Sequence, residues 1–364
     1  MKFSCKTKDI LEGVQIVANL CQARTTKPVL QCIKIQVEKN ELLLLGTDME
    51  VAMRFWLRDL DIQEEGVALL PSQKLLSMLR EIDDEITSFN SDQSVCMIST
   101  SNAKFKLISD DPDEFPMIPE YDLKDALEIN GGIFKKFAGK TLFAVARDMS
   151  CYAYNGVLIE VYENGIKFVA TDGRRLSLAG NVDRDQINVI SSSVVPIKGV
   201  SQLIKSIEEE ESSILIKIVD NQFIMRTDRV EVASRLLEGD FPDYREAVPK
   251  DNHLCISIEK ELFSAALRKV SITAGSEVRS VLFEFKKGML NFFSQQEGIG
   301  ESESSVPVDF SDKEFKITFN PDFIMDYLKV MTNDNVKLYF KDEESSCLIE
   351  DSDQEFYIVM PITK

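Results

Sequence analysis

Three stretches of sequence decide the fold of this chain: Ala68-Leu69-Leu70-Pro71, Val194-Val195-Pro196 and Ile317-Thr318-Phe319-Asn320-Pro321. Each is a mostly apolar run that ends at a proline, and the three prolines lie 125 residues apart. Proline lacks the N–H group that the first turn of a helix does not use, so each stretch predicts a strand that leads into a helix. The fourth and seventh residues after every proline are apolar and fall on one helix face. The chain is therefore predicted to be one unit repeated three times.

The other elements of each unit follow the same period. Each unit is predicted to begin with a short strand, at Phe3, Ile129 and Cys255, and an amphipathic helix comes next. Hairpins are then expected to turn at Lys39-Asn40, Asn164-Gly165 and Lys287-Gly288, of which Asn-Gly is the strongest signal. The apolar faces of the first helices are predicted to be Ile10, Leu11, Val14 and Val17; Phe134, Phe137, Leu142 and Val145; and Leu262, Phe263, Ala266 and Val270.

More strands are predicted after each proline helix, so a unit reads strand, helix, several strands, helix, several strands. This order predicts an α+β fold in which two helices lie on one side of antiparallel sheet. The expected domains are residues 1–125, 126–252 and 253–364. A fixed rotation between them would place all six helices on one face of an arc. The repeat is too long for a solenoid, and repeated heterologous contacts either close or form filaments, so we expect a closed ring.

Composition places the chain among globular proteins of a reducing compartment. Of its 364 residues 44% are hydrophobic and 28% are charged, which is ordinary for a globular protein. The seven cysteines are scattered without a CxxC pair, so we interpret them as reduced, mostly buried thiols. No signal peptide or membrane-length apolar stretch is present. We expect a cytoplasmic protein with no membrane partner.

The distribution of charge is more informative than its sum. The net charge of −19 argues against a protein that coats nucleic acid, but the acids gather in runs such as Glu208–Glu211, which read as solvated surface. Residues 134–147 carry four cations and no acid, and two of the lysines fall in the first helical turn, where the helix dipole disfavours them. This segment therefore indicates contact with a phosphate backbone. For Arg80, Arg268 and Lys269, late in their helices, simple complementation of the dipole remains an equal alternative.

Four motifs together resemble one protein family. They are Met1-Lys2-Phe3, residues 171–176 (TDGRRL), residues 237–245 (LEGDFPDYR) and the terminal residues 357–361 (YIVMP). The chain resembles, over its whole length, the bacterial DNA sliding clamps, the beta subunits of DNA polymerase III. The resemblance implies three-domain crescents that form a head-to-tail homodimeric ring around duplex DNA, without sequence preference and with twelve helices lining the hole. It also implies, as partners, the polymerase III alpha subunit, other polymerases and a separate ATP-dependent clamp loader, with no cofactor on this chain.

The resemblance further implies a peptide-binding groove between the second and third units. Such a groove makes physical sense as a small apolar pocket with a basic rim, into which an extended peptide inserts an apolar side chain. The alternative for Leu176, Val359 and Met360 is that they are plain core. The chain departs from the family at Glu246, at Tyr154 and at its last three residues, so altered groove selectivity is expected. The matching positions are Tyr154, Thr171, Gly173, Arg174, Arg175, Leu176, Pro242, Ala247, Val359, Met360, Pro361 and Ile362.

Contacts to DNA and between subunits are implied in the same way. Family positions that contact DNA match Arg24, Tyr152 and Lys198, whereas Gln73, Asp148 and Ala153 depart from the pattern, and Asp148 should repel phosphate. The subunit interface is expected to join cations around an aromatic residue in the first unit to acids in the third, although a lysine-guarded free edge is the alternative. The predicted DNA-binding residues are Arg24, Lys135, Lys136, Lys140, Arg147, Tyr152 and Lys198. The predicted interface residues are Lys104, Phe105, Lys106, Ile272, Glu297, Glu301 and Glu303.

The sequence favours a non-catalytic processivity clamp over two other classes. An enzyme would need a nucleophile, a metal site or an acid–base set, but the chain has one histidine, His253, and no HExxH, GxSxG or clustered metal-ligand motif. Asp48 and Asp172 form the only suggestive carboxylate pair, and each is predicted to end a hairpin in its own unit. The remaining alternative is a scaffold that binds proteins without enclosing DNA.

Overall fold

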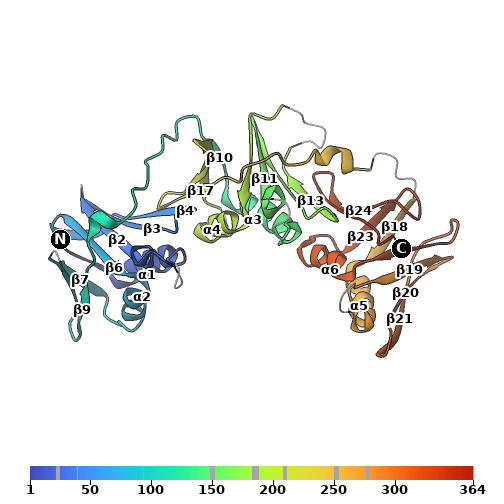
Figure 1. Ribbon diagram of the computed structural model, residues 1–364, viewed down its shortest axis with the longest axis horizontal. Coiled ribbons are helices and arrows are strands. Elements are labelled where there is room, and N and C mark those ends of the chain that lie inside the picture. Colours follow the sequence, from blue (N-terminus) through green and yellow to red (C-terminus); the bar gives the residue numbers. More distant parts are fainter. Residues whose placement is uncertain are drawn as a thin grey trace. The chain divides into compact units, whose positions relative to one another are not determined.

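A computed structural model describes residues 1–21, 25–38, 40–92, 94–147, 152–182, 188–207, 211–249, 254–275 and 279–363, and for Tyr152 only the backbone. The chain divides into two compact units. Unit 1 comprises Met1–Phe134 and Lys198–Leu236, and unit 2 comprises Lys135–Ile197 and Leu237–Lys364. Each unit therefore holds one complete predicted repeat and part of the middle one. Figure 1 labels the elements of both.

The predicted order of elements is confirmed. Within the described residues, each third of the chain runs strand, helix, strands, helix, three strands, with five strands between the helices in the first third and four in the others. The antiparallel α+β class follows from this order and from the pairing of the strands. The helices are α1 (Thr7–Ala18), α2 (Ser72–Arg80), α3 (Gly131–Thr141), α4 (Ile197–Ser206), α5 (Lys260–Val270) and α6 (Pro321–Val330).

Unit 1 contains two antiparallel sheets. The first has the order β5-β1-β7-β8-β9, and the second has the order β10-β15-β16-β17-β4-β3-β2-β6. The pairing of β17 with β4 joins the middle of the chain to its beginning within one sheet. The strands are β1 (Lys2–Lys6), β2 (Cys32–Glu38), β3 (Glu41–Thr47), β4 (Val51–Leu57), β5 (Leu60–Glu64), β6 (Gly66–Pro71), β7 (Ile86–Ser91), β8 (Val95–Ser99), β9 (Lys104–Ile108), β10 (Leu127–Asn130), β15 (Ser213–Val219), β16 (Gln222–Arg226) and β17 (Val230–Arg235).

Unit 2 has the corresponding arrangement. Its large sheet has the order β14-β11-β12-β13-β25-β24-β23-β18, and its small sheet has the order β21-β20-β19-β22. The pairing of β13 with β25 joins the middle of the chain to its end. The strands are β11 (Gly156–Tyr162), β12 (Gly165–Thr171), β13 (Arg175–Gly180), β14 (Ser191–Pro196), β18 (Leu254–Glu259), β19 (Val281–Lys286), β20 (Met289–Gln296), β21 (Gly300–Pro307), β22 (Phe315–Phe319), β23 (Asn335–Phe340), β24 (Cys347–Ser352) and β25 (Glu355–Val359).

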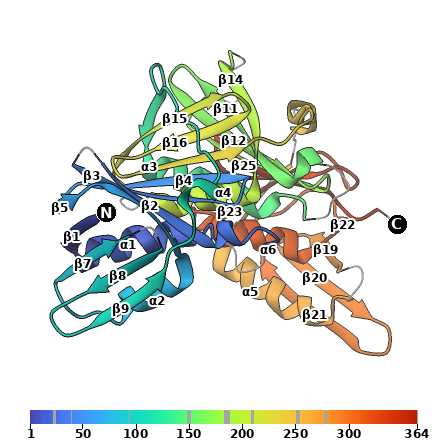
Figure 2. The same cartoon turned by 60° about the vertical axis from the view of Figure 1, so that its left-hand side comes forward.

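Apolar helix faces hold each unit together. In unit 1, α1 packs against α2 and against β3 and β4, and Figure 2 shows the two helices side by side. In unit 2, α5 packs against α6, and the ring of Phe263 lies against those of Phe283 and Phe292, with centroids 6.2 and 5.8 Å away. These rings are fully or almost fully buried. The repeated strands and helices therefore build a hydrophobic core in each unit.

Three details of the sequence prediction were wrong. Helix α3 ends at Thr141, where the threonine hydroxyl donates to the carbonyl of Phe137 at 3.0 Å, and a 3-10 turn (Leu142–Ala144) follows. Leu142 and Val145 therefore lie beyond the helix, in keeping with the weak helix propensity of its glycines. The buried face of α5 begins at Phe263, so the preceding residue, Leu262, lies outside this face and is 45% exposed. Residues 163–164 form the second hairpin turn, one position before the predicted pair, and Lys39 of the first turn lies outside the described residues.

Two global expectations concern membranes and thiols. Among the described residues, no helix has the length and apolarity needed to cross a membrane. The described cysteines are free; Cys255 is exposed and the others are buried. Burial raises the pKa of the Cys5 thiol to about 12 and that of the Cys96 thiol to about 11. Cys151 lies outside the described residues.

Candidate functional site

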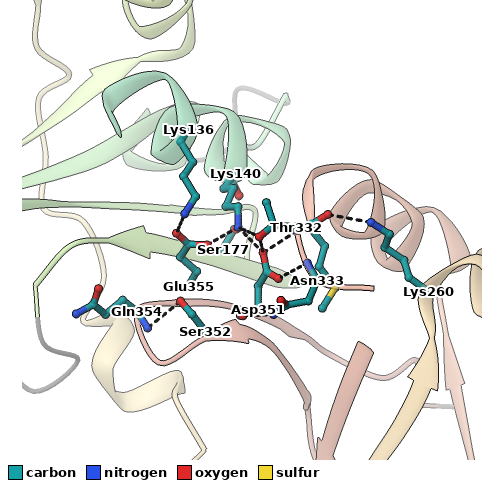
Figure 3. Close-up of polar contacts among 11 residues, drawn as sticks. Lys136, Lys140, Ser177, Lys260, Thr332, Asn333, Asp351, Ser352, Gln354 and Glu355 are labelled. Carbon is teal, nitrogen blue, oxygen red and sulfur yellow. Dashed lines mark hydrogen bonds and ion pairs between the residues drawn. The ribbon is translucent and has the colours of Figure 1, made fainter. Parts of the chain in front are cut away.

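The lysines of α3 have three different environments, of which Figure 3 shows those of Lys136 and Lys140. Lys140 is 3% exposed, and its ammonium group contacts the carboxylates of Asp351 and Glu355, on β24 and β25. Lys136 is about half exposed and also pairs with Glu355. Lys135 is partly exposed and makes no ion pair within the described part of the chain. Two of the three cations are therefore engaged with carboxylates of unit 2.

Asp351 organises the buried end of this network. Its carboxylate accepts hydrogen bonds from the Thr332 hydroxyl at 2.6 Å and from the backbone N–H groups of Thr332 and Asn333, each at 2.9 Å. Burial alone would raise the pKa of Asp351, but the hydrogen bonds from Lys140 and Thr332 outweigh it and lower the pKa to about 2. The group is thus a permanent anion that holds Lys140 in place.

The prediction that Lys140 contacts DNA is wrong for this reason. Removing a buried ammonium from two carboxylates would cost several kcal/mol, far more than an exposed phosphate contact returns. Lys198, on α4 in unit 1, is a milder case because it is partly exposed but pairs with Asp48 and lies 3.5 Å from Glu50. Its charge is largely neutralised within the protein.

Of the other predicted DNA contacts, some are described by the structure and some are not. Arg147 is exposed and lies beyond the 3-10 turn that follows α3. Arg24 and Asp148 lie outside the described residues, and so does the side chain of Tyr152, whose backbone begins a 3-10 turn (Tyr152–Asn155). Of the predicted DNA contacts whose side chains are described, Lys136 and Arg147 are exposed and Lys135 is partly exposed, and all three belong to unit 2.

The predicted groove residues begin with the loop of residues 171–175, here called the Thr171 loop. The Thr171 hydroxyl donates to the carbonyl of Arg175 at 2.7 Å, and the Asp172 carboxylate accepts the N–H groups of Arg174 and Arg175, both at 3.0 Å. Gly173 has φ +82°, a backbone conformation that favours glycine. These bonds shape the loop, so Asp172 has a structural role.

The end of the chain lies beside this loop. The N–H of Met360 donates to the carbonyl of Arg174 at 2.9 Å, and the N–H of Ile362 donates to the carbonyl of Thr318 at 2.8 Å. Met360 is 49% exposed, which is unusual for a side chain of this size. Arg174 is also exposed. The predicted apolar anchor point and basic rim are thus adjacent within unit 2.

Three predicted groove residues are instead part of the interior. Arg175 is mostly buried, and its guanidinium pairs with Asp172 at 2.9 Å and Asp326 at 3.0 Å. Leu176 and Val359 are 5% and 0% exposed. The prediction that Arg175 belongs to the basic rim is therefore wrong, because its charge is satisfied internally. For Leu176 and Val359 the alternative of plain core is the observed state.

A second wall of the predicted groove comes from residues 241–247. Tyr154 meets Phe241 edge to face with ring centroids 6.4 Å apart, and it also lies next to Gly173. Pro242 and Ala247 are exposed on this segment. The segment ends in a 3-10 turn (Tyr244–Ala247) that the Asp243 side chain caps. Tyr154 thus connects the Thr171 loop with the second wall.

A buried carboxylate that the sequence prediction missed fixes this wall. The buried carboxylate of Glu160, on β11, accepts hydrogen bonds from the hydroxyls of Tyr162 and Tyr244 and from the guanidinium of Arg245, all at 2.8 Å. Burial, followed by the negative charge of Glu160, raises the pKa of Tyr244 well above its ordinary value. A lone charge inside a predicted strand, Glu160 in Val157–Val161, was the only available signal.

The predicted interface residues lie on edge strands. Lys104, Phe105 and Lys106 belong to β9, the edge of the small sheet of unit 1, and both lysines are exposed. Glu301 and Glu303 are exposed on β21, the edge of the small sheet of unit 2. Ile272 is 79% exposed. The prediction missed two exposed isoleucines near these edges, Ile108 at 72% and Ile299 at 67%.

No group of three or more potential metal-ligating side chains occurs among the described residues, which exclude His253. Asp48 and Asp172 both cap loops through backbone N–H groups, as described for Asp172 above. Loop capping is a sufficient physical explanation for each carboxylate.

Comparison with known proteins decides the family. Three models of the DNA polymerase III beta subunit match the chain in order: the N-terminal domain over residues 1–119, the central domain over 128–243 and the C-terminal domain over 245–363. The chain belongs to the DNA polymerase III beta subunit family. It is therefore a DNA sliding clamp by class, a processivity factor and a non-catalytic polymerase subunit. The enzyme alternative is set aside on this ground.

Individual relatives agree with the family assignment. The chain is 26% identical to the beta sliding clamps of Pseudomonas putida and Haemophilus influenzae, with all of both chains covered in each case. Among solved structures, the DNA polymerase III subunit beta of Pseudomonas aeruginosa matches with a TM-score of 0.95 at 25% identity, again over the whole of both chains. The beta subunit of Thermotoga maritima matches at 26% identity with a TM-score of 0.89, covering 100% of this chain and 99% of the other. The three-domain clamp fold is thus shown.

Proposed function

We propose that two copies of this chain join head to tail into a ring that encloses duplex DNA and holds DNA polymerases close to the primer end. The observation that carries this proposal is the match of all three family domains, in order, over the full length of the chain. The work of such a ring is topological, since a closed ring stays on DNA without tight binding. We further propose that it acts in the cytoplasm, where thiols stay reduced.

The exposed edge strands support closure of the ring. A strand edge with unpaired backbone groups adds readily to another chain. In this protein β9 carries the cations Lys104 and Lys106, whereas β21 carries the acids Glu301 and Glu303. Pairing of unlike edges is heterologous, which closes a ring when the rotation fits. The charges would set the head-to-tail polarity of the dimer, and Phe105 and Ile272 would supply apolar contact.

Weak cationic contact supports sliding. The exposed cations Lys135, Lys136 and Arg147 can meet phosphates without reading bases, so they carry no sequence preference. The net charge of −19 keeps the rest of the protein from binding DNA. Because few cations contact the DNA and the acidic remainder of the protein repels it, the protein can move along the duplex.

The surface around Met360 and Arg174 supports recruitment of partners. A half-exposed methionine beside an exposed arginine fits an extended peptide with an apolar residue and an acid. We propose that the polymerase III alpha subunit, other polymerases and the clamp loader bind here. A polymerase held in this way gains effective concentration at the DNA end, and no chemistry by the clamp is needed.

Retention on circular DNA tests the proposal. Purified protein is loaded onto nicked circular DNA by a clamp loader, and the DNA is then linearised in half of the sample. A ring stays on the circle and runs off the free ends, so retention should fall to background after linearisation. Equal retention on both forms would contradict the ring, and a protein that is never retained would favour the scaffold alternative.

A further inference from the structure

Unit 1 contains a second copy of the Thr171 loop. In residues 47–51, here called the Thr47 loop, the Thr47 hydroxyl donates to the carbonyl of Val51 at 2.9 Å. The Asp48 carboxylate accepts the N–H groups of Glu50 at 3.0 Å and Val51 at 2.8 Å. The N–H of Met49 donates to Thr47 at 3.0 Å, as that of Gly173 does to Thr171 at 3.1 Å. The two loops, 124 residues apart, share every one of these bonds.

The strand beside the loop is also repeated. The N–H of Arg235 donates to the carbonyl of Glu50 at 2.8 Å, just as that of Met360 donates to the carbonyl of Arg174 at 2.9 Å. The sheet registers correspond as well, since Ser234 pairs with Val51 and Val359 pairs with Arg175. Unit 1 therefore reproduces within itself the backbone that surrounds the proposed partner surface of unit 2.

The corresponding position in unit 1 contains a cavity, here called the hollow. A cavity of about 100 Å³ opens between the Thr47 loop and residues 116–121, which contain the counterpart of Pro242. That volume is of the order of one aliphatic side chain. Met117 is 93% exposed and Met49 is 47% exposed at its mouth. The lining residues used below are Met49, Glu50, Met117, Tyr121 and Arg235.

Two residues of the lining are in energetically unfavourable states. Met49 has φ +77° where the other loop has glycine, so its side chain is held over the hollow at a cost in backbone strain. The hydroxyl of Tyr121 is shielded from solvent and has no hydrogen-bond partner among the described residues. An unpaired buried hydroxyl is costly, and a carbonyl brought into the hollow would satisfy it.

The two places differ in their charged residues. Unit 2 has a cation on the loop, Arg174, and an apolar residue on the strand, Met360. Unit 1 has an acid on the loop, Glu50, and a cation on the strand, Arg235. Glu50 lies 3.5 Å from the ammonium group of Lys198, whereas the exposed guanidinium of Arg235 makes no ion pair in the described part of the chain. Arg235 is therefore the rim cation with which an acid of a bound segment could pair.

We propose that this hollow in unit 1 is a second peptide-binding site, for an extended segment with one aliphatic side chain and one neighbouring acid. The aliphatic side chain fills the hollow between Met49 and Met117, a peptide carbonyl accepts from Tyr121, and the acid pairs with Arg235. The inference rests on the proposed use of the Met360 surface in unit 2 as a peptide site. A clamp with two such sites holds two clients, or two segments of one client, at the same time.

Methionine methyl NMR distinguishes the two sites. The full-length protein is labelled with ¹³C-methyl methionine, and the signals of Met49, Met117 and Met360 are assigned with single leucine variants. The probe is the blocked peptide acetyl-Gly-Leu-Asp-Leu-Gly-amide, and its asparagine analogue is the control. We expect saturable shifts at Met49 and Met117, with about tenfold weaker binding for the analogue and for Arg235→Glu. The matched variant Lys124→Glu reverses an 85% exposed charge of unit 1 and should bind as the parent does.

Each outcome bears on one proposal or on both. Shifts at Met360 without shifts at Met49 and Met117 overturn the second site and leave the proposed function intact. Shifts at Met49 and Met117 alone support the second site and contradict the Met360 surface. Shifts at Met49 and Met117 that Arg235→Glu does not weaken overturn the proposed recognition of an acid. Silence at all three methyls contradicts both sites.

Discussion

The ammonium group of Lys140, on α3, forms a buried ion pair with the carboxylate of Asp351, on β24, 211 residues further along the chain. Glu355 on β25 shares the same ammonium group and also binds Lys136. Since β25 leads directly to Met360, the network ties α3 to the strand that presents the proposed partner surface. The two charges of this pair serve stability within unit 2.

The first prediction concerns the removal of Asp351. Asp351→Asn leaves Lys140 with one carboxylate, so we expect the free energy of unfolding to fall by about 3 kcal/mol at neutral pH. The pKa of Asp351 is about 2 in the folded protein, below its ordinary value of 3.8. The ionised group therefore stabilises the fold above about pH 4, and this contribution is lost as the pH falls from 4 to 2. Urea unfolding followed by circular dichroism over this range should show a smaller pH dependence in the variant.

Glu284→Gln is the control for this experiment, because it removes a carboxylate that pairs with the surface lysines Lys286 and Lys316 at 2.7 and 2.8 Å. We expect a change of less than about 1 kcal/mol at neutral pH. An Asp351→Asn protein that unfolds at the parental urea concentration would contradict the structural role of the pair.

The second prediction separates the exposed cations from the buried one. Lys135→Glu and Arg147→Glu should each weaken binding to a short duplex and lower the slope of log affinity against log salt by about 1, since each cation replaces one counterion. Lys140→Met should lower the melting temperature instead and leave the salt slope of the folded protein unchanged. Lys287→Glu, an exposed charge reversal outside α3, is the matched control. If Lys140→Met lowers the slope as much as Lys135→Glu does, the assignment of Lys140 to the interior is wrong.

Much of the fold could be predicted from the sequence because its period is set by local chemistry. A proline after an apolar run can end a strand and start a helix, as at Pro71 and Pro321. The order of elements in all three thirds followed from this signal. The end of α3 did not follow from this signal. The glycines of the helix and the hydroxyl of Thr141 favour its end at Thr141, although the apolar pattern continues to Val145.

The site was less predictable because a sequence shows charge but not its partner. Lys140 and Lys135 look equivalent in the run Lys135–Arg147, yet the partners that bury Lys140 lie more than 200 residues away. Arg174 and Arg175 are adjacent in the same way, but only Arg175 meets Asp326. The resemblance placed both arginines in one groove, whereas Arg174 lies exposed in the Thr171 loop and Arg175, the first residue of β13, turns to Asp172 and Asp326. Contacts of this kind become visible only with the fold in hand.

The third prediction tests Glu160 as the residue that positions the second wall. Glu160→Gln keeps the shape of the side chain but removes the charge that binds Arg245 and faces Tyr244. We expect faster amide hydrogen exchange over residues 241–247 and several-fold weaker binding of the acidic peptide probe at Met360. The raised pKa of Tyr244 keeps its hydroxyl neutral in the folded protein, so the group stabilises the fold below about pH 10 and loses this effect as the pH rises further. The variant should show a smaller loss of stability above pH 10.

A control variant for the third prediction is Tyr327→Phe, which removes a tyrosine hydroxyl in the other hydrophobic cluster of unit 2. It should leave exchange over residues 241–247 unchanged. Unchanged exchange in Glu160→Gln as well would show that the wall is held by packing of Phe241 and Tyr154 alone.

The fourth prediction concerns the edge strands. Ile272 is 79% exposed, so Ile272→Asp should not disturb the fold of unit 2, but it should convert a dimer into a monomer, measured by light scattering, and abolish retention on circular DNA. Ile190→Asp, at a residue that is 67% exposed and lies outside the predicted interface, is the matched control and should remain dimeric. Reversal of both lysines, Lys104→Glu with Lys106→Glu, should also give monomers. Mixing that variant with Glu301→Lys, Glu303→Lys protein should restore association because both edge pairings of the mixed dimer are again of opposite charge. A dimer that survives both Ile272→Asp and the lysine reversal would place the interface elsewhere on the chain.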